Sequence, residues 1–401
     1  MSEPDTVDPL TAIKAYCAAI PTLADIPDPI PESENPNALF CNGWLRKGGG
    51  AFLIAPTGQG KSTWTIQAAL CWAQGKEAFG IKPVKPLKIA IIQSEDDKDE
   101  LAQFRNDIVG GLLNDKTFGV DADSVKEAST RILLPEITGV IGKDFADRIS
   151  WLLENHKDID LLIVNPFKAY FGSDTLSNAD VTEFLRCHID PVIKGHPVGI
   201  LFVHHTNKPP KPKERKDWDI DVFSQYIGSG AAELADWPRA ILVLMPCEQT
   251  RGLYRLVASK RGNRLGWIDA AGEKTTVRFI AHSTGRIFWR NATPEEIAAL
   301  SKKNKEKGKR DECDGEDEVK RAEKLAEYAR AKPQKSTDLR DYACAIFERT
   351  RGRSAYDYLR EHASDFGLLV VPAKRKNAAF IGLPKETAEA ALKWDTDKPK
   401  G

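Results

Sequence analysis

The sequence lacks a surplus of charge of either sign, because its 401 residues include 58 lysines and arginines and 58 aspartates and glutamates. With zero net charge, no field of the whole molecule attracts nucleic acid, and any such contact must be local. Long apolar runs are also missing, since no segment approaches the roughly eighteen apolar residues that a membrane span needs. The first residues are rich in acids and prolines, unlike the basic and then apolar pattern of a signal segment. We therefore expect a soluble, intracellular protein.

Cysteine is sparse and unpatterned. The seven cysteines lie at positions 17, 41, 71, 187, 247, 313 and 344, without a C-x-x-C pair. An odd number without paired spacing argues against a disulfide framework and a zinc module, and for a reducing cytoplasm. The hydrophobic content of 41% and the charged content of 29% are ordinary for a globular protein. The length predicts about two domains.

The most informative segment is Ala-Pro-Thr-Gly-Gln-Gly-Lys-Ser at residues 55–62. It matches the phosphate-binding loop pattern, with Ala55 in place of the usual first glycine. The apolar run 51–54 predicts a buried strand before the loop, and residues 62–72 predict a helix behind it. The alternative is a plain glycine turn, which this context disfavours.

Such a loop binds phosphate through backbone N–H groups at a helix N-terminus. Lys61 would reach the β- and γ-phosphates, and the Ser62 hydroxyl would ligate Mg²⁺. We therefore expect ATP and Mg²⁺ as cofactors. The residues expected to contact the nucleotide are Thr57, Gly58, Gln59, Gly60, Lys61, Ser62 and Thr63.

Strands and helices alternate from residue 38 to about residue 296. Strands are predicted at 52–55, 89–93, 161–165, 200–204 and 241–245, and helices at 63–74, 97–113, 142–156 and 178–194. The strands are continuously apolar, as expected when both faces of a parallel sheet are covered. This order is typical of a doubly wound α/β domain. Segments 254–260, 275–281 and 286–290 predict antiparallel strands at the sheet edge.

The flanking segments differ in character. Residues 1–37 contain seven prolines and predict a peripheral arm with one helical patch at 10–19. Residues 297–318 include a basic and then an acidic run almost without apolar residues, which is typical of a solvated linker.

Residues 319–395 predict a small winged-helix-like α+β domain. The expected elements are helices at 319–331, 337–349 and 354–366 and strands at 368–371 and 378–382. We expect DNA contact through the basic wing, and docking to a protein is the alternative. The cations concerned are Arg349, Arg351, Arg353, Lys374, Arg375 and Lys376.

Polar residues follow the second, third and fourth predicted strands. Ligands bind at the carboxyl ends of parallel strands, so Glu95 can activate the water that attacks the γ-phosphate. Alternatively, Ser94 caps the next helix and the neighbouring acids only favour its dipole. Asn165 stands where an acid normally holds Mg²⁺, and its amide brings no charge. His204 and His205 could sense the γ-phosphate, or be ordinary histidines satisfied by core or backbone.

Two basic segments complete the candidate sites. The long loop 207–230 predicts a contact with a phosphate backbone, although a solvated loop is the alternative. Its cations are Lys208, Lys211, Lys213, Arg215 and Lys216. Lys260 and Arg264 lie at a strand end, where cations could reach a nucleotide across a subunit boundary or be ordinary turn charges.

As an ordered set, these segments resemble the RecA-like core of the RepA-type hexameric helicase ATPases, with DnaB-type helicases and KaiC-like ATPases as more distant relatives. The resemblance covers roughly residues 38–290. It rests on NGWL at 42–45, APTGQGKST, QSEDDKDELAQFR, LLIVNPF, VHHTNK, GSGAAELADWPRAILVL with Arg239, and SKRGNRLGW.

The resemblance implies a RecA-like doubly wound, mostly parallel sheet with antiparallel edge strands. It further implies that Glu95 is the hydrolytic glutamate and His205 the γ-phosphate sensor. Lys260 and Arg264 would act in trans, and the 207–230 loop would face a central channel. Asn165 departs from the aspartate of the family, which puts the rate of turnover in question.

The leading interpretation is a homo-oligomeric, hexameric ATPase that moves along single-stranded DNA, as a replicative helicase of a plasmid, phage or other mobile element does. The alternative is a non-motor regulator that assembles on ATP and hydrolyses it slowly, which Asn165 favours modestly. A P-loop small-molecule kinase is disfavoured by the His-His pair and the appended domain.

Overall fold

The computed structural model describes residues 20–206, 232–247, 252–283, 285–373 and 379–396, without the side chains of 301–316 and 350. The chain forms two compact units, Met1–Ile297 and Ala298–Gly401, each described here by itself. None of the helices within these ranges is long and apolar enough to cross a membrane. The basic loop 207–230 and the helical patch 10–19 lie outside the described residues.

The first unit is built on one nine-stranded sheet with the order β3-β2-β4-β5-β1-β6-β7-β8-β9. The parallel strands are β1 (Gly50–Ala55), β2 (Ile89–Gln93), β3 (Ile132–Leu133), β4 (Leu161–Asn165), β5 (Gly199–His205) and β6 (Ala240–Pro246). The antiparallel strands are β7 (Leu253–Lys260), β8 (Val277–His282) and β9 (Trp289–Asn291). This arrangement confirms the predicted doubly wound, mostly parallel α/β sheet with antiparallel edge strands.

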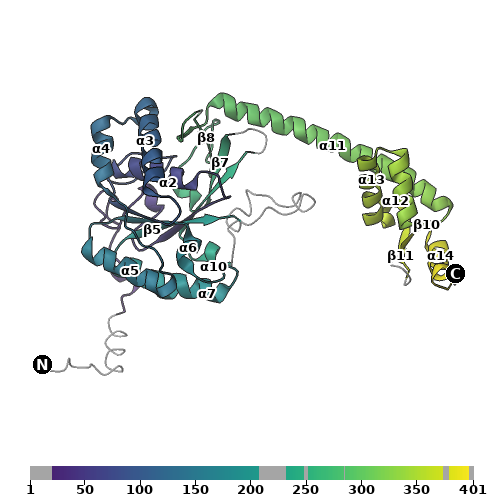
Figure 1. The fold of residues 1–401 in the computed structure, drawn as a ribbon, viewed down its shortest axis with the longest axis horizontal. Helices are drawn as coiled ribbons and strands as arrows, with labels where there is room; N and C mark the ends of the chain where they lie inside the picture. Colours follow the sequence, from purple (N-terminus) through teal and green to yellow (C-terminus); the bar gives the residue numbers. More distant parts are fainter. Residues whose placement is uncertain (1–19, 207–231, 248–251, 284, 374–378, 397–401) are drawn as a thin grey trace, which may run out of the picture. The chain divides into compact units, whose positions relative to one another are not determined.

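Helices cover both faces of this sheet (Figure 1). On one face lie α2 (Lys61–Ala73), α3 (Lys98–Asn114) and α4 (Ala122–Thr130). On the other lie α5 (Gly142–Asn155), α6 (Phe167–Phe171), α7 (Asn178–Thr182) and α10 (Glu233–Asp236). Short 3-10 turns occupy Leu23–Asp25, Cys41–Gly43, Lys116–Phe118 and Gly262–Leu265. The expected single helix at 178–194 is α7 followed by a π-helix (Glu183–Ile189) and α8 (Asp190–Gly195).

The two cores follow from strand periodicity. Successive residues of β1 alternate between the layers, so that Leu53 packs with α2 and Phe52 with α5. All six residues of β1 are buried, which explains their continuous apolar run. Helix α2 is also buried almost all round and therefore holds the segment after the loop rigidly against the sheet.

The second unit contains α11 (Pro294–Ala331) from Ala298 onward, α12 (Ser336–Ile346), α13 (Arg349–Glu361), the 3-10 turn Ala363–Phe366 and α14 (Pro384–Thr396). Its antiparallel sheet has the order β10-β12-β11, formed by Gln334–Lys335, Ala379–Gly382 and Leu369–Pro372. The expected linker 297–318 lies within the helix α11, which begins at Pro294. Its charged residues are good helix formers, so solvation does not prevent a helix there.

Helix α13 begins at Arg349, whereas the sequence predicts a helix from Ser354. The Arg-Gly-Arg segment therefore belongs to the helix and is not a turn. Gly352 is needed for packing, because a Cβ there would lie 2.2 Å from the carbonyl oxygen of Ala343 in α12. The wing cations Lys374, Arg375 and Lys376 lie outside the described residues, and the winged-helix assignment stays a prediction.

Candidate functional site

The loop between β1 and α2 has the backbone shape of a phosphate cradle. Gly58 and Gly60 both have a φ of 74°, a left-handed conformation that glycine adopts without strain. Gly60 is the N-cap of α2, so the free N–H groups of the first helical turn face the loop. Space around the Cβ direction of Gly58 is open. The predicted loop residues are therefore arranged as an anion site at a helix N-terminus.

Lys61 provides the positive charge inside this cradle. Its side chain is buried, and Nζ donates to the carbonyl oxygens of Ala55 at 3.3 Å and Pro56 at 2.9 Å. Burial lowers the pKa of Lys61, and the nearby Glu95 carboxylate opposes this shift. Carbonyls alone leave the ammonium uncompensated, so the geometry fits a terminal phosphate as its partner.

Oxygen atoms gather around the Ser62 hydroxyl. Asn165, at the end of β4, is buried, and its Nδ2 donates to Ser62 Oγ at 3.0 Å. Burial raises the pKa of Asp96, and a hydrogen bond with the Ser62 hydroxyl lowers it. Hydroxyl, amide and carboxylate oxygens are the donors that Mg²⁺ prefers, so this cluster fits the ion. Asp96 is not among the residues that the sequence predicts for the site.

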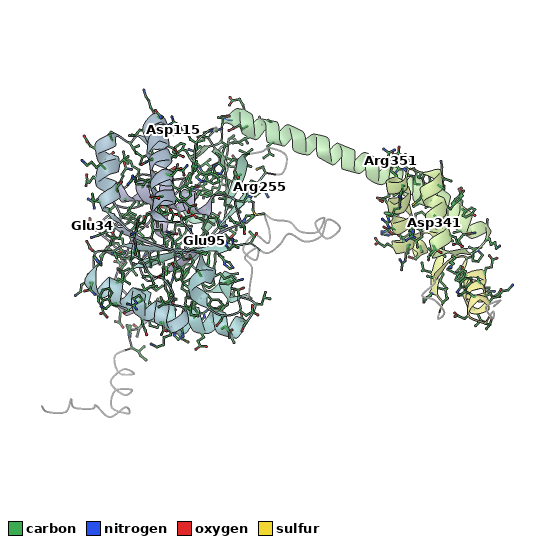
Figure 2. All side chains as sticks on the ribbon, in the orientation of Figure 1. Glu34, Glu95, Asp115, Arg255, Asp341 and Arg351 are labelled. Carbon is green, nitrogen blue, oxygen red and sulfur yellow. The ribbon has the colours of Figure 1, made fainter. Side chains whose placement is uncertain are left out.

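Glu95 occupies a turn that is shaped by Gln93, the register neighbour of Asn165. Gln93 Oε1 accepts from the backbone N–H groups of Glu95 at 3.1 Å and Asp96 at 2.8 Å. The Glu95 side chain is exposed, and its charge acts on both Lys61 and His205. Figure 2 labels Glu95 at the level of the sheet.

Capping of α3 does not involve Glu95 or Ser94. The N-cap is Asp97, whose Oδ1 accepts from the N–H groups of Asp99 and Glu100 at 2.8 Å. The Glu100 carboxylate accepts a hydrogen bond from the Asp97 N–H at 3.1 Å and completes a capping box. The alternative interpretation therefore applies to Asp97 and Glu100, and Ser94 is not the cap.

His205 lies at the end of β5, against the loop. Its Nδ1 is 3.2 Å from Thr57 Oγ1, so the side chain is linked directly to the phosphate cradle. Burial lowers the pKa of His205, the Lys61 charge lowers it further, and Glu95 opposes both. The imidazole is therefore neutral at pH 7. The structure brings Lys61, Glu95 and His205 into one electrostatically coupled group.

A buried brace supports the loop from behind. Gln67 of α2 donates to the Trp289 carbonyl at 2.7 Å and accepts from the Trp289 N–H at 2.9 Å. The indole N–H of Trp289 donates to Thr63 Oγ1 at 3.1 Å, and a Cβ at Gly60 would lie 3.0 Å from the indole ring. These residues were missed because a buried glutamine leaves no periodic signal.

Lys260 and Arg264 do not join the loop within one chain. Lys260 pairs with Ile241 of β6, at the end of the sheet where β1 begins. The phosphate-binding loop follows the opposite end of β1. Lys260 Nζ donates to the carbonyls of Ala235 and Asp236 at 2.8 Å.

Arg264 belongs to a cluster of cations on that edge. Its Nη1 donates to the carbonyl of Asn42 at 3.2 Å. The pKa of Arg261 is lowered by burial and then by its positive neighbours. Those neighbours are Arg264, Arg239 and Arg46.

Two comparisons found proteins that are similar to part of this chain. A family model described as an AAA domain matches residues 23–211. Among solved structures, the chain is similar to the crystal structure of the RadB recombinase, at 14% identity and a TM-score of 0.36, over 61% of this chain and 89% of that chain. No curated protein matches the sequence significantly. The family match covers the phosphate-binding loop and the strands β1 to β5 of the first unit.

Proposed function

We propose that the protein is a homo-oligomeric ATPase acting on nucleic acid, a hexameric RepA-like replicative helicase of a plasmid, phage or other mobile element. The observation that carries the proposal is the convergence of Lys61, Glu95 and His205 on one glycine-shaped loop. A lone phosphate-binding loop needs neither a free carboxylate nor a neutral histidine beside its lysine. Their presence supports hydrolysis rather than binding alone.

In this mechanism the loop amides and Lys61 bind the phosphates of ATP. The ammonium exchanges its contacts with the Ala55 and Pro56 carbonyls for the β- and γ-phosphate oxygens. Bound Mg²⁺ would neutralise charge that develops on those oxygens, and Ser62 and Asn165 are positioned to hold it. The Trp289 brace keeps the first turn of α2 in place, so the cradle is preorganised.

Glu95 then orients the attacking water and takes its proton. Its carboxylate is exposed to water and close enough to Lys61 for the two charges to interact, and a carboxylate in this position can act as a general base. The neutral His205 donates or accepts one hydrogen bond next to Thr57 and detects whether a γ-phosphate is present. Because His205 ends β5, a change there passes directly into the segment that follows, which includes the basic loop 207–230.

The positions of two cations support completion of the site by a neighbouring subunit. Lys260 and Arg264 lie away from the phosphate-binding loop of their own chain, so we propose that they contact a phosphate bound by another copy. Mutual repulsion within the arginine cluster is relieved by an anion. Arginines supplied in trans accelerate phosphoryl transfer by about 10³–10⁵.

Mixing two inactive variants tests the shared site. Lys61→Ala removes the cradle but keeps the trans cations, and Arg264→Ala does the opposite. We expect each variant alone to be inactive and mixed oligomers to regain a fraction of wild-type ATP turnover. Failure of the mixture to recover, although light scattering shows that oligomers form, would place Arg264 outside the active site.

Support for a nucleic-acid contact within the described residues comes from α13. Arg349, Arg353 and Arg360 are exposed and lie at i, i+4 and i+11, on one stripe of the helix. Arg351, labelled in Figure 2, adds a further exposed cation on the same helix. Helix α13 follows α12 after a short turn and packs closely on it at Gly352, as the second helix of a helix-turn-helix does.

A charge-reversal pair tests this surface. Arg349→Glu with Arg353→Glu is expected to weaken DNA binding and to reduce its salt dependence, because fewer phosphate contacts release fewer counterions. Lys320→Glu with Lys324→Glu, exposed residues of α11, makes the same charge change and serves as the control. Equal loss in both pairs would indicate a general charge effect and not a binding face.

The second candidate is a regulator that assembles on ATP and hydrolyses it slowly. The uncharged Asn165 favours it, because it holds Mg²⁺ less tightly than an aspartate. ATP-driven strand separation of a forked duplex distinguishes the two, since only a motor produces it. Particle size with and without a non-hydrolysable ATP analogue tests assembly. If calorimetry detects no adenine nucleotide binding, both candidates are refuted.

A further inference from the structure

The 3-10 turn Cys41–Gly43, which precedes β1 in the chain, lies against the arginine cluster. The Gly43 carbonyl oxygen accepts hydrogen bonds from Arg261 Nη1 and Arg264 Nη1, each at 3.4 Å. The Asn42 carbonyl oxygen accepts another from Arg264 Nη1 at 3.2 Å. Two neighbouring backbone carbonyls therefore hold two guanidinium groups, although 218 to 222 positions separate the partners in the sequence.

Arginines that lie this close together need a partner that fixes their direction. The pKa of Arg261 is lowered by burial and then by the positive charges of its arginine neighbours, so the members of the cluster repel one another. The side chains of Arg264 and Arg46 are also exposed and would otherwise sample many rotamers. Carbonyl oxygens carry partial negative charge and bind charged donors strongly, so the turn counters the repulsion and holds the guanidinium groups in one place.

Glycine leaves room for this contact at position 43. Gly43 is buried and has a φ of 61°, a conformation that glycine adopts without strain. A Cβ there would lie 3.0 Å from both Arg264 Nη1 and Arg46 Nε. This is tighter than ordinary Cβ contacts, so a side chain at position 43 displaces the arginines.

The contact is fixed from both sides. Arg261 has a φ of 58°, a left-handed conformation that arginine rarely adopts. Residues held in such conformations cluster where function requires a fixed geometry. On the other side, the Asn42 N–H donates to Glu32 Oε2 at 2.8 Å, which ties the turn to the segment before it.

We propose that the Asn42–Gly43 turn is a positioning device that directs Arg261 and Arg264 towards a phosphate bound by a neighbouring subunit. Glu32 anchors this device. The inference rests on the proposed shared site. The turn lies, like the arginines that it holds, away from the phosphate-binding loop of its own chain. Its loss should therefore impair ATP turnover in the neighbouring subunit and leave nucleotide binding by its own loop intact.

ATP turnover and nucleotide binding of the full chain separate a positioning role from a structural one. Gly43→Ala is expected to lower kcat about 10²-fold, which is the cost of a misplacement of about 1 Å. Its affinity for a fluorescent ATP analogue should stay at the wild-type level. Mixed with Lys61→Ala, whose arginines are intact, Gly43→Ala should regain turnover as Arg264→Ala does.

The matched control is Gly48→Ala. Gly48 has a φ of 73°, so the substitution introduces the same kind of backbone strain. A Cβ there would meet only Lys194 and Ile193, at the ordinary contact distances of 3.8 and 3.9 Å. This variant should therefore keep most of the wild-type turnover.

A second variant tests the anchor without changing a glycine. Glu32→Ala is expected to lower kcat in the same direction, but less than Gly43→Ala, with nucleotide affinity retained. Its control is Glu34→Ala, which removes an exposed acid two residues along and should keep wild-type turnover.

Two outcomes would overturn the inference. One is a turnover in Gly43→Ala equal to that in Gly48→Ala. The other is a loss that mixing with Lys61→Ala does not repair, although the mixture of Lys61→Ala with Arg264→Ala recovers, because the defect would then lie in the chain's own cradle. If Arg264→Ala alone keeps wild-type turnover, the proposed shared site itself fails, and the inference falls with it.

Discussion

Replacing Gln67 by methionine is expected to loosen the brace behind the phosphate cradle. Gln67 is fully buried and makes two hydrogen bonds to the backbone of Trp289, at 2.7 and 2.9 Å. Methionine has a similar volume, so the change removes the bonds without opening a large cavity. The N–H and carbonyl of Trp289 then stay buried without partners, because Trp289 is itself fully buried.

The size of the effect follows from those two groups. Each buried polar group left unsatisfied costs about 1–3 kcal/mol. Burying the apolar atoms of methionine in place of an amide offsets about 1 kcal/mol, so for the two groups together we expect a net loss of about 1–5 kcal/mol. At about 2–4 °C for each kcal/mol, this corresponds to a fall in melting temperature of roughly 2–20 °C. Nucleotide affinity should fall as well, since Trp289 contacts Thr63 and packs against Gly60.

Differential scanning calorimetry of the full chain measures the shift, and Gln74→Met is the matched control. Gln74 lies near the end of the same helix, is half-buried and bonds only to the Leu70 carbonyl at 2.8 Å. We expect that variant to lose less than about 1 kcal/mol. If both variants melt at the same temperature, the Gln67–Trp289 bonds do not stabilise the unit and the reasoning is refuted.

Three further outcomes are expected. Glu95→Gln should lower ATP turnover about 10²- to 10⁴-fold and retain nucleotide affinity. The control variant Asp99→Asn should keep wild-type turnover. Normal turnover in Glu95→Gln would remove Glu95 from the mechanism. Burial lowers the pKa of His205 in the folded state, so the unfolded chain binds more protons and stability falls as pH drops below about 6.5. The difference in melting temperature between pH 7 and pH 5 should therefore be smaller in His205→Gln than in the wild type. An equal difference in the two proteins would contradict this. Gly352→Val should destabilise the second unit by about 1–3 kcal/mol, because the new side chain clashes with Ala343. Calorimetry should show unfolding of the second unit at a lower temperature. An unchanged transition temperature would argue against the close packing of α13 on α12.

Several site residues are predictable because their signal is local. The apolar strand, the glycines and Lys61 follow one another within about a dozen positions, so the cradle is visible in the chain itself. The placement of Glu95 and His205 beside it follows from a general rule, that parallel strands end at one edge of a sheet. The same rule explains why Asn165 meets Ser62.

Other features require the fold, because they join distant segments through single side chains. Asp96 looks like one more acid of a helix start, whereas in the structure Gln93 binds its backbone and Asp97 caps α3. The sequence predicts a helix from Ser354, whereas close packing on α12 at Gly352 accompanies a helix that begins at Arg349. Helix propensity is a weak local preference, and tertiary contacts outweigh it.

The order of residues alone determined that this chain folds as an α/β sheet with a phosphate-binding loop, because buried strands and glycine turns impose their periodicity and spacing on the sequence. The tertiary structure alone decided which side chains support that loop. Asn165 reaches Ser62 across 103 positions and Trp289 reaches Gln67 across 222. Contacts over such separations depend on how the strands are ordered in the sheet, and strand order leaves no repeating pattern in the sequence.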